Sequence, residues 1–248
     1  MGCLLGDAAI VRSSPTSSWR LVFRHGQAQE AYCWHKAEQL ADYVTTPPVA
    51  GKNRGWGKIT VSFGTVSSSA FDLLAAITTQ DGKKTVTAVW AAALTWESLA
   101  YWVMDDGTRQ ANRIYFCTHG FSKTEVELLA RRLREMGMSS ATAAPVKVRG
   151  QVKHIIRLNT DDSRRLSRQV EPWVHPSLQY KLIPERPQVT CSICGQKFPG
   201  RKDQAKARDP VCKRRECSLT RHRKLSKQSL TESRRQAKNL RARQRSSA

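Results

Sequence analysis

The chain has 248 residues, and its 42 lysines and arginines against 20 aspartates and glutamates give a formal net charge of +22 at pH 7. This excess predicts a polyanionic partner, and nucleic acid fits better than a membrane surface because no basic amphipathic stretch carries an exposed aromatic face. No apolar run approaches the roughly 20 residues that span a bilayer. The apolar stretch at the N-terminus is short and is not preceded by the positively charged residues of a secretory signal. We therefore expect an intracellular protein with no membrane partner.

The first third of the chain alternates between helical and extended patterns. It opens with a short apolar run, residues 2–5, that is closed by Asp7. The spacing of apolar residues then predicts a strand over 19–23, a helix over 27–44, an alternating strand over 59–65 and a short helix over 71–77. The basic pair Lys83-Lys84 follows this helix.

A second apolar helix that ends in acids lies over residues 94–106. Its apolar positions cover most of the helix surface, which predicts a buried helix that ends at Gly107 in a left-handed conformation. Asp105 and Asp106 stand at the negative end of the helix dipole, where an acid costs roughly 0.3–1 kcal/mol. Taken alone, such an end also fits an ordinary turn. If it is more than a turn, it needs a divalent metal or a cluster of basic side chains to offset the charge.

The order of elements repeats after Asp106. A strand is predicted over 113–117, a helix over 123–136, an alternating strand over 153–160 and a helix over 163–170, and Lys181 follows. Asp7 and Asp106 are 99 residues apart, and the intervals from Thr65 to Lys84 and from Thr160 to Lys181 are 19 and 21 residues. This agreement predicts an internal duplication.

A resemblance to a known family is carried by residues 99–107 together with Phe121, residues 180–182, the Lys83–Val86 segment and the Gly2–Asp7 run. In these segments the chain resembles the two-motif LAGLIDADG homing endonucleases, in particular the single-chain enzymes encoded within group I introns. The resemblance covers about residues 1–183. It implies an α+β fold with two pseudo-twofold-related αββαββα halves, 1–90 and 91–183, whose antiparallel sheets form a saddle on double-stranded DNA. A monomer with internal symmetry is the expected state.

Two packed apolar helices would bring Asp7 and Asp106 together at their C-terminal ends. Close carboxylates repel one another and attract divalent cations, and hard oxygen ligands select Mg²⁺. The resemblance implies the same assignment, with one acid from each motif and one DNA strand cut by each half. It also places Lys84 and Lys181 at the site, to stabilise charge on phosphate or to orient or deprotonate water. An ordinary surface position is the alternative for both lysines, and Asp105 is expected to cap the helix or bind water.

Two departures from the family pattern concern the first motif. Ala8 stands where the family has a glycine, which predicts about 1 kcal/mol of strain if that turn requires a positive φ. The first helix also lacks its N-terminal turns. We therefore expect either that the start codon is assigned too late or that this copy of the motif is shortened. Three cysteines, Cys3, Cys33 and Cys117, are predicted to be free core thiols. Five scattered histidines lack metal-ligand spacing and are predicted to have structural or surface roles: His25, His35, His119, His154 and His175.

Basic loops and strands make up the predicted DNA surface. Residues 51–58 form a basic loop, and residues 145–153 form a hairpin rich in lysine and arginine. Each alone also fits a solvated loop, but a two-stranded ribbon suits the major groove. The predicted DNA contacts are Arg20, Arg24, Lys58, Arg113, Arg149, Lys153 and Arg157.

The C-terminal part reads as a separate module. After a linker over 184–190, a C-x2-C pair and a C-x4-C pair predict a zinc-binding module over 191–222, with the ligands Cys191, Cys194, Cys212 and Cys217. His222 is a weaker candidate ligand, and disulfides do not suit an intracellular protein. Residues 223–248 are a basic tail that we expect to be disordered without nucleic acid and helical on DNA. Residues 191–248 hold 18 basic and 4 acidic residues, a net +14.

The leading hypothesis is a site-specific, Mg²⁺-dependent endonuclease that makes a double-strand break at an intron insertion site, in the cytoplasm or wherever the intron-bearing genome resides. An alternative is a maturase that binds intron RNA and assists splicing, or a catalytically weakened relic of the same fold. A zinc-dependent DNA-binding regulator leaves the duplicated acid-ended helices unexplained.

Overall fold

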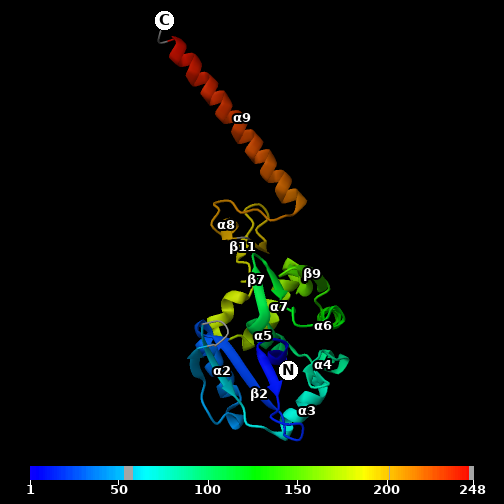
Figure 1. Ribbon diagram of the computed structural model, residues 1–248. Helices are drawn as coiled ribbons and strands as arrows, with labels where there is room; N and C mark the ends of the chain where they lie inside the picture. The colour runs from blue at the N-terminus through cyan, green and yellow to red at the C-terminus, as the bar shows by residue number, and fades with distance from the viewer. Residues whose placement is uncertain (53–57, 201, 246–248) are drawn as a thin grey trace. The chain divides into compact units, whose positions relative to one another are not determined.

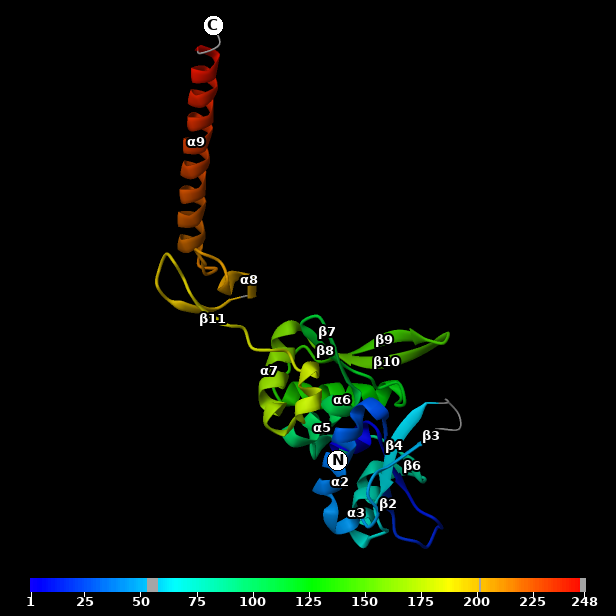
Figure 2. The same cartoon turned by 90° about the vertical axis from the view of Figure 1, so that its left-hand side faces the viewer.

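The computed structural model describes residues 1–52, 58–200 and 202–245. The chain divides into two compact units, Met1–Pro184 and Glu185–Ala248, shown together in Figures 1 and 2. Both predicted halves, 1–90 and 91–183, lie in the first unit. Residues 53–57 of the predicted basic loop and residues 246–248 of the predicted tail lie outside the described residues.

The first half of this unit contains a four-stranded antiparallel sheet with the strand order β1-β2-β4-β3. Its elements, in chain order, are α1 (Gly2–Leu5), β1 (Ala8–Val11), β2 (Arg20–Gly26), α2 (Glu30–Gln39), β3 (Val49–Lys52), β4 (Ile59–Gly64) and α3 (Ser69–Thr78). Short 3-10 segments at Gln27–Gln29 and Ala41–Tyr43 flank α2, so the predicted helix over 27–44 is divided into three pieces. A small hairpin, β5 (Thr79–Gln80) and β6 (Lys83–Lys84), closes the half.

The second half repeats this order after the short connecting helix α4 (Ala88–Ala92). It runs α5 (Trp96–Asp106), β7 (Gly107–Gln110), β8 (Arg113–Phe116), α6 (Lys123–Glu135), β9 (Thr142–Val148), β10 (Gln151–Arg157) and α7 (Thr160–Val170), followed by 3-10 segments at Glu171–Trp173 and Pro176–Lys181. Its sheet has the order β7-β8-β10-β9, which matches the first sheet strand for strand. The predicted α+β fold with two αββαββα halves is therefore confirmed.

Local sequence signals set the helix starts in the second half. The Thr95 side chain accepts a hydrogen bond from the Ser98 backbone N–H at the start of α5. At the start of α6, Ser122 and Glu125 form a reciprocal capping box. These caps satisfy backbone donors that a helix end otherwise leaves unpaired.

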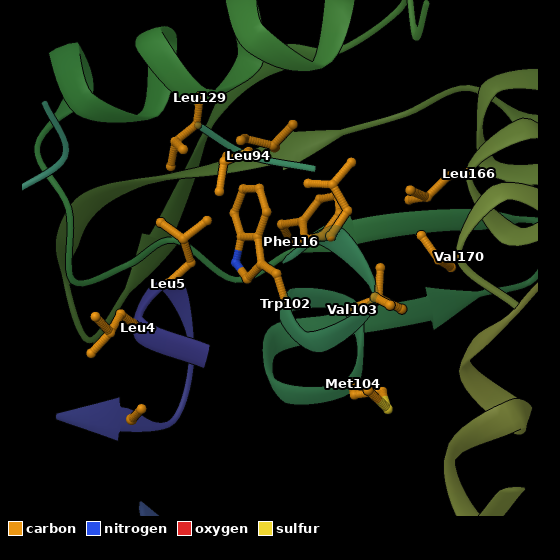
Figure 3. Packing of buried hydrophobic residues seen from close by; sticks show 14 of the residues in the cluster. Leu4, Leu5, Leu94, Trp102, Val103, Met104, Phe116, Leu129, Leu166 and Val170 are labelled. Atoms are coloured by element: carbon orange, nitrogen blue, oxygen red, sulfur yellow. The ribbon is translucent and has the colours of Figure 1, made fainter. Parts of the chain in front are cut away.

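One hydrophobic core joins the two halves. Leu4 and Leu5 of α1 and Trp102 of α5 are among its fully buried residues, and the Trp102 ring stacks on Phe116 with ring centroids 4.0 Å apart (Figure 3). The core cluster runs from Leu4 to Ile183, so the boundary between the halves remains an interpretation of the repeat.

Close approach of α1 to α5 depends on glycine. A Cβ atom at Gly2 would collide with the Ser98 carbonyl, and one at Gly6 would collide with the Asp105 side chain. Gly107, by contrast, is extended, with φ −70° and ψ 131°, so the predicted left-handed helix end is wrong. It is needed there because a Cβ would collide with the Val103 carbonyl. Ala8 does not have a positive φ, so the strain predicted at this departure is absent.

The second unit is small and rich in cysteine. It contains the hairpin β11 (Gln188–Thr190) and β12 (Lys197–Pro199), a short helix α8 (Lys202–Ala205), and a long helix α9 (Arg215–Arg245). The predicted basic tail lies on α9, and whether this helix persists without nucleic acid stays a prediction. Over the described residues of both units, no helix combines the length and apolarity that crossing a membrane requires.

Candidate active site and metal cluster

Asp7 and Asp106 occupy equivalent positions in the two halves. Asp7 lies in the turn between α1 and β1, and Asp106 is the last residue of α5. The sheet register pairs Ala8 with Phe23 and Gly107 with Phe116, which aligns the two acids residue for residue.

The two carboxylates have opposite electrostatic environments. Burial, together with repulsion from Asp7 and Asp105, raises the pKa of Asp106 to about 7. Burial also acts to raise the pKa of Asp7, but a hydrogen bond from His25 and the positive charges of Lys36 and Lys181 outweigh it, and the pKa of Asp7 is lowered. Repulsion from Asp7 therefore disfavours the charged form of Asp106, whereas the neighbours of Asp7 favour its charged form.

Lys84 and Lys181 each donate to backbone carbonyls beside one of the two acids, and the Gly6 and Asp105 carbonyls that they contact are equivalent in the two halves. The Lys84 ammonium donates to the carbonyls of Gly6 and Ala8, at 3.3 and 3.2 Å. The Lys181 ammonium donates to the carbonyls of Met104 and Asp105, the latter at 3.0 Å. Each lysine therefore places a positive charge at the negative end of one helix dipole, the offset that the sequence requires.

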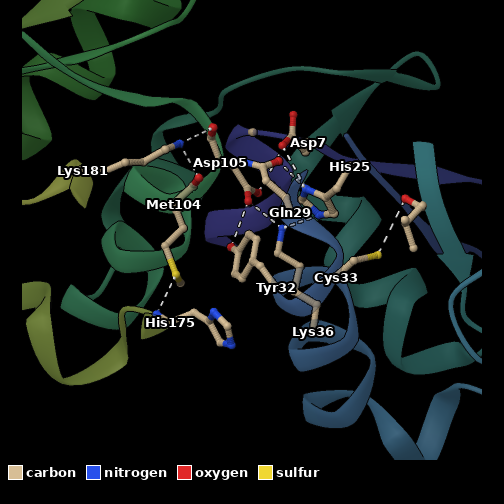
Figure 4. A network of polar contacts seen from close by, with 12 residues as sticks. Asp7, His25, Gln29, Tyr32, Cys33, Lys36, Met104, Asp105, His175 and Lys181 are labelled. Carbon is tan, nitrogen blue, oxygen red and sulfur yellow. Dashed lines mark hydrogen bonds and ion pairs between the residues drawn. The ribbon is translucent and has the colours of Figure 1, made fainter. Parts of the chain in front are cut away.

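Asp105 belongs to a buried polar network (Figure 4). Its Oδ1 accepts from the Lys36 ammonium at 2.6 Å and from the Tyr32 hydroxyl at 2.9 Å, and its Oδ2 accepts from the Asp7 backbone N–H at 3.3 Å. Burial raises the pKa of Asp105, and the charge of Lys36 opposes that shift. Asp105 of the second motif thus contacts Tyr32 and Lys36 on α2 of the first half.

His25 extends the network to the Asp7 side chain. Its Nδ1 lies 3.3 Å from Asp7 Oδ2, and its Nε2 lies 3.2 Å from the Lys36 ammonium. The sequence alone does not identify His25, Tyr32 and Lys36 as site residues. A lysine four residues after Tyr32, on the apolar side of α2, was the available signal, because a buried lysine requires a partner.

The donor set suits a divalent cation at the helix ends. Both oxygens of Asp105 are already hydrogen-bonded, whereas the Asp106 carboxylate has no hydrogen bond or ion pair within the described residues. Asp7, His25 and Asp105 also lie close enough together to hold a metal. Hard carboxylate oxygens at Asp7 and Asp106 fit Mg²⁺ better than a set that includes imidazole.

Most of the predicted DNA-contacting residues lie on exposed sides of the two sheets. Arg20 and Arg24 alternate with buried residues along β2, and Lys58 is exposed just before β4. Arg113 of β8 and Arg157 of β10 are exposed, and Arg157 lies over the Tyr115 ring at 6.0 Å. The remaining two residues lie on or near the β9–β10 hairpin: Lys153 is half-buried on β10, and Arg149 is exposed at the turn with φ 48°.

The second unit brings its four cysteines together. One sulfur atom from each of Cys191, Cys194, Cys212 and Cys217 lies within 4.8 Å of the others, and His222 is not in the cluster over the described residues. Backbone N–H groups of Cys212 and Cys194 outweigh the effect of burial and lower the pKa of Cys191 to about 6, while burial and the neighbouring sulfurs raise the pKa of Cys217 to about 12. Four cysteine sulfurs this close together could hold one metal ion, and Zn²⁺ commonly takes four such ligands.

Comparison with known proteins agrees with the repeated fold. The probable intron-encoded endonuclease 1 of Wickerhamomyces canadensis is 27% identical over 194 residues, which cover 74% of this chain and 81% of that protein. Cytochrome b mRNA maturase bI2 of Saccharomyces cerevisiae is 25% identical over 73% of this chain and 45% of its own length. The solved structure of the homing endonuclease I-WcaI bound to its DNA recognition sequence is 28% identical, with a TM-score of 0.64, and the match covers 73% of this chain and 82% of that one.

A family model described as the LAGLIDADG DNA endonuclease family matches residues 1–166, which include both acid-ended helices and both sheets. Since this match spans more than half of the sequence, the chain belongs to the LAGLIDADG DNA endonuclease family.

Proposed function

We propose that the protein is a site-specific homing endonuclease that makes a Mg²⁺-dependent double-strand break in DNA at an intron insertion site. The observation that carries this proposal is the pair of packed, acid-ended helices, whose equivalent carboxylates Asp7 and Asp106 repel one another. Similarity to an intron-encoded endonuclease and to a DNA-bound homing endonuclease supports the same activity.

In this proposal Asp7 and Asp106 hold the metal, and each half cuts one strand. Bound Mg²⁺ supplies an activated water and stabilises charge on the scissile phosphate. Lys84 donates to the Gly6 carbonyl at the end of α1 and Lys181 to the Asp105 carbonyl at the end of α5, so their ammonium groups stay beside the acids. From there they stabilise negative charge that develops on phosphate, or orient the attacking water.

DNA would lie against the two sheets. In Figure 2 the strand pairs β3–β4 and β9–β10 project from the same side of the first unit. The exposed sides of the sheets carry equivalent residues, for example Arg20 and Arg113, because the register aligns β2 with β8. Two-stranded ribbons of this kind fit the major groove.

The C-terminal unit would add a zinc-stabilised DNA contact. We assign Zn²⁺ to the four-cysteine cluster, since a unit with so small a core needs a metal to fold. The basic residues of α9 would contact phosphates, which adds affinity but no sequence information.

Cleavage of a duplex made from the joined flanks of the host intron tests the function. The wild-type protein should linearise this DNA with Mg²⁺ and leave it intact with EDTA. Asp7→Asn and Asp106→Asn should each slow the double-strand cut by about a thousandfold or more, because metal coordination supplies several kcal/mol to the transition state. Full activity in either variant would refute the two-acid assignment.

A maturase that binds intron RNA is the second candidate, and similarity to a cytochrome b mRNA maturase favours it. In this case splicing of the intron RNA would require the protein, whereas Asp7 and Asp106 would be dispensable. A splicing assay with the two Asp→Asn variants separates the candidates. Normal splicing by both variants, together with no DNA cleavage by the wild type, would replace the nuclease proposal with the maturase.

A further inference from the structure

The polar network beneath Asp7 is not repeated beneath Asp106. The register that aligns Phe23 with Phe116 makes Thr118 the counterpart of His25. The Thr118 hydroxyl donates to the His154 carbonyl at 2.8 Å, so it is committed to the backbone of β10. In the same alignment Gly6 is the counterpart of Asp105, so the first motif has no carboxylate at this position.

The supporting helices differ in the same way. Helix α2 buries Lys36 beneath the first site, with only 1% of the residue exposed. The buried residues of α6, its counterpart, are all apolar: Val126, Leu129, Ala130 and Leu133. All three parts of the network, an imidazole, an ammonium and a carboxylate, are therefore present only on the Asp7 side, over the described residues.

The contacts of His25 define its tautomer. An ammonium group can only donate, so Nε2, which lies 3.2 Å from Lys36, must accept. The ring proton then resides on Nδ1, which faces two acceptors, Asp7 Oδ2 at 3.3 Å and Gln29 Oε1 at 3.4 Å. Asp105, with 2.6 Å to Lys36, holds the ammonium in place.

We propose that His25 is a positioning residue for Asp7 alone, held in its Nδ1–H tautomer by Lys36 and Asp105, so that the two half-sites of the nuclease are built differently. Its Nδ1–H is shared between Gln29 Oε1 and Asp7 Oδ2, and the contact with Oδ2 restricts the direction of the Asp7 carboxylate and leaves its other oxygen for a cation or water. The Asp7 backbone N–H is fixed at the same time by Asp105 Oδ2. The consequence for catalysis rests on the proposed function: cleavage of one strand depends on the network, and cleavage of the other does not.

Strand-resolved cleavage tests this consequence. On a duplex labelled separately at each 5′ end, His25→Leu should slow one strand about tenfold or more relative to the other, the range expected when a group that supports a metal ligand is removed. His25→Asn retains an N–H donor near the position of Nδ1 and should keep the strand ratio close to that of the wild type. Thr118→Val, at the equivalent position of the second half, is the matched control and should also leave the ratio unchanged. An equal loss on both strands in His25→Leu, as general destabilisation would produce, would overturn the proposal.

Histidine NMR provides a readout that needs neither metal nor cleavage. In the ¹⁵N-labelled full-length protein, the ring-nitrogen chemical shifts of His25 should be those of an Nδ1–H imidazole. Lys36→Met should move these shifts toward those of the Nε2–H form. An Nε2–H pattern in the wild type would overturn the positioning role whatever the activity. A wild-type protein that shows the Nδ1–H pattern but cuts neither strand would refute the proposed function and the strand asymmetry, and would support the positioning role.

Discussion

Asp105 and Asp106 are adjacent in sequence, but their side chains have different partners. Asp105 points into the first half, where Lys36 and Tyr32 satisfy Oδ1 and the Asp7 backbone satisfies Oδ2. Asp106 remains at the helix end, with its pKa raised to about 7 by burial and by the acids beside it. The Asp105 carboxylate is therefore bound by groups of the protein interior, and the Asp106 carboxylate is available to a ligand.

At this scale we predict that Lys36→Met lowers the free energy of unfolding by about 3–5 kcal/mol, because it leaves the Asp105 carboxylate buried without a counter-ion. Urea unfolding measures the change. Lys123→Met is the matched control, since the Lys123–Glu127 ion pair is exposed and its loss should cost no more than about 0.5 kcal/mol. The double variant Lys36→Met/Asp105→Asn should recover part of the loss. Equal effects of the two single substitutions would contradict the account.

At the scale of elements, the site depends on how closely α1 packs against α5. Gly2 and Gly6 are one helical turn apart in sequence, and both meet α5 at distances that exclude a Cβ atom. α1 has only four residues, against eleven in α5, so the position of Asp7 depends on the close packing of this short helix against α5. The polar network on α2 supplies part of that support.

Gly6→Ala should destabilise the protein by about 1–3 kcal/mol, the usual cost of inserting a methyl group into a packed interface, and it should also reduce cleavage because Asp105 must move. Thermal unfolding and a cleavage assay measure the two effects. Gly26→Ala provides the control, since Gly26 has φ −65° and open space around it, and it should be neutral or stabilising by up to about 1 kcal/mol. A Gly6→Ala protein as stable as Gly26→Ala would show that α1 and α5 pack less closely at this point than the account requires.

Elements with strong periodicity could be predicted from the sequence, whereas contacts that cross between the halves could not. The buried helix around Trp102 and the alternating strands β4 and β10 follow from local patterns, and the repeat predicts the matching sheets. The pairing of Lys36 with Asp105 spans 69 residues, and the local sequence shows only a lysine on the apolar side of α2 without identifying its partner. The sequence therefore predicts no more than a structural or surface role for His25. Gly107 shows the same limit: glycine is required there by the close approach of Val103 rather than by a positive φ.

At the scale of the whole molecule, the chain combines a family fold with a second unit that lies beyond the family match. Residues 1–166 match the family, whereas the four-cysteine cluster and α9 follow Pro184. A net +14 lies between Cys191 and the C-terminus, which is more than half of the net charge of the chain. Specificity and general affinity for DNA would thus be divided between the two units.

The purified full-length protein should contain about one zinc ion per chain, because the four thiolates complete one tetrahedral site. Atomic absorption measures this content. Cys212→Ser should lose most of the zinc, whereas Cys117→Ser, which changes a free thiol of the first unit, should retain it. Equal zinc content in the two variants would contradict the assigned ligands.

Replacing the nine lysines and arginines of residues 223–248 with glutamine should weaken binding to cognate and unrelated DNA alike. The logarithm of the binding constant should also fall less steeply with the logarithm of salt concentration, by a slope of about 0.9 for each phosphate that is no longer neutralised. Fluorescence anisotropy at several salt concentrations measures both effects. A change in the position of the DNA cut would contradict a role limited to phosphate binding.

The most direct test of the two-acid site is a crystal structure of the full-length protein on its target duplex with Mn²⁺, located by anomalous scattering. We expect manganese to be coordinated by carboxylate oxygens of both Asp7 and Asp106 and by a DNA phosphate at the ends of α1 and α5. Manganese held by Asp7, His25 and Asp105 with Asp106 uninvolved, or Asp7 and Asp106 on separate surfaces of the complex, would contradict the account.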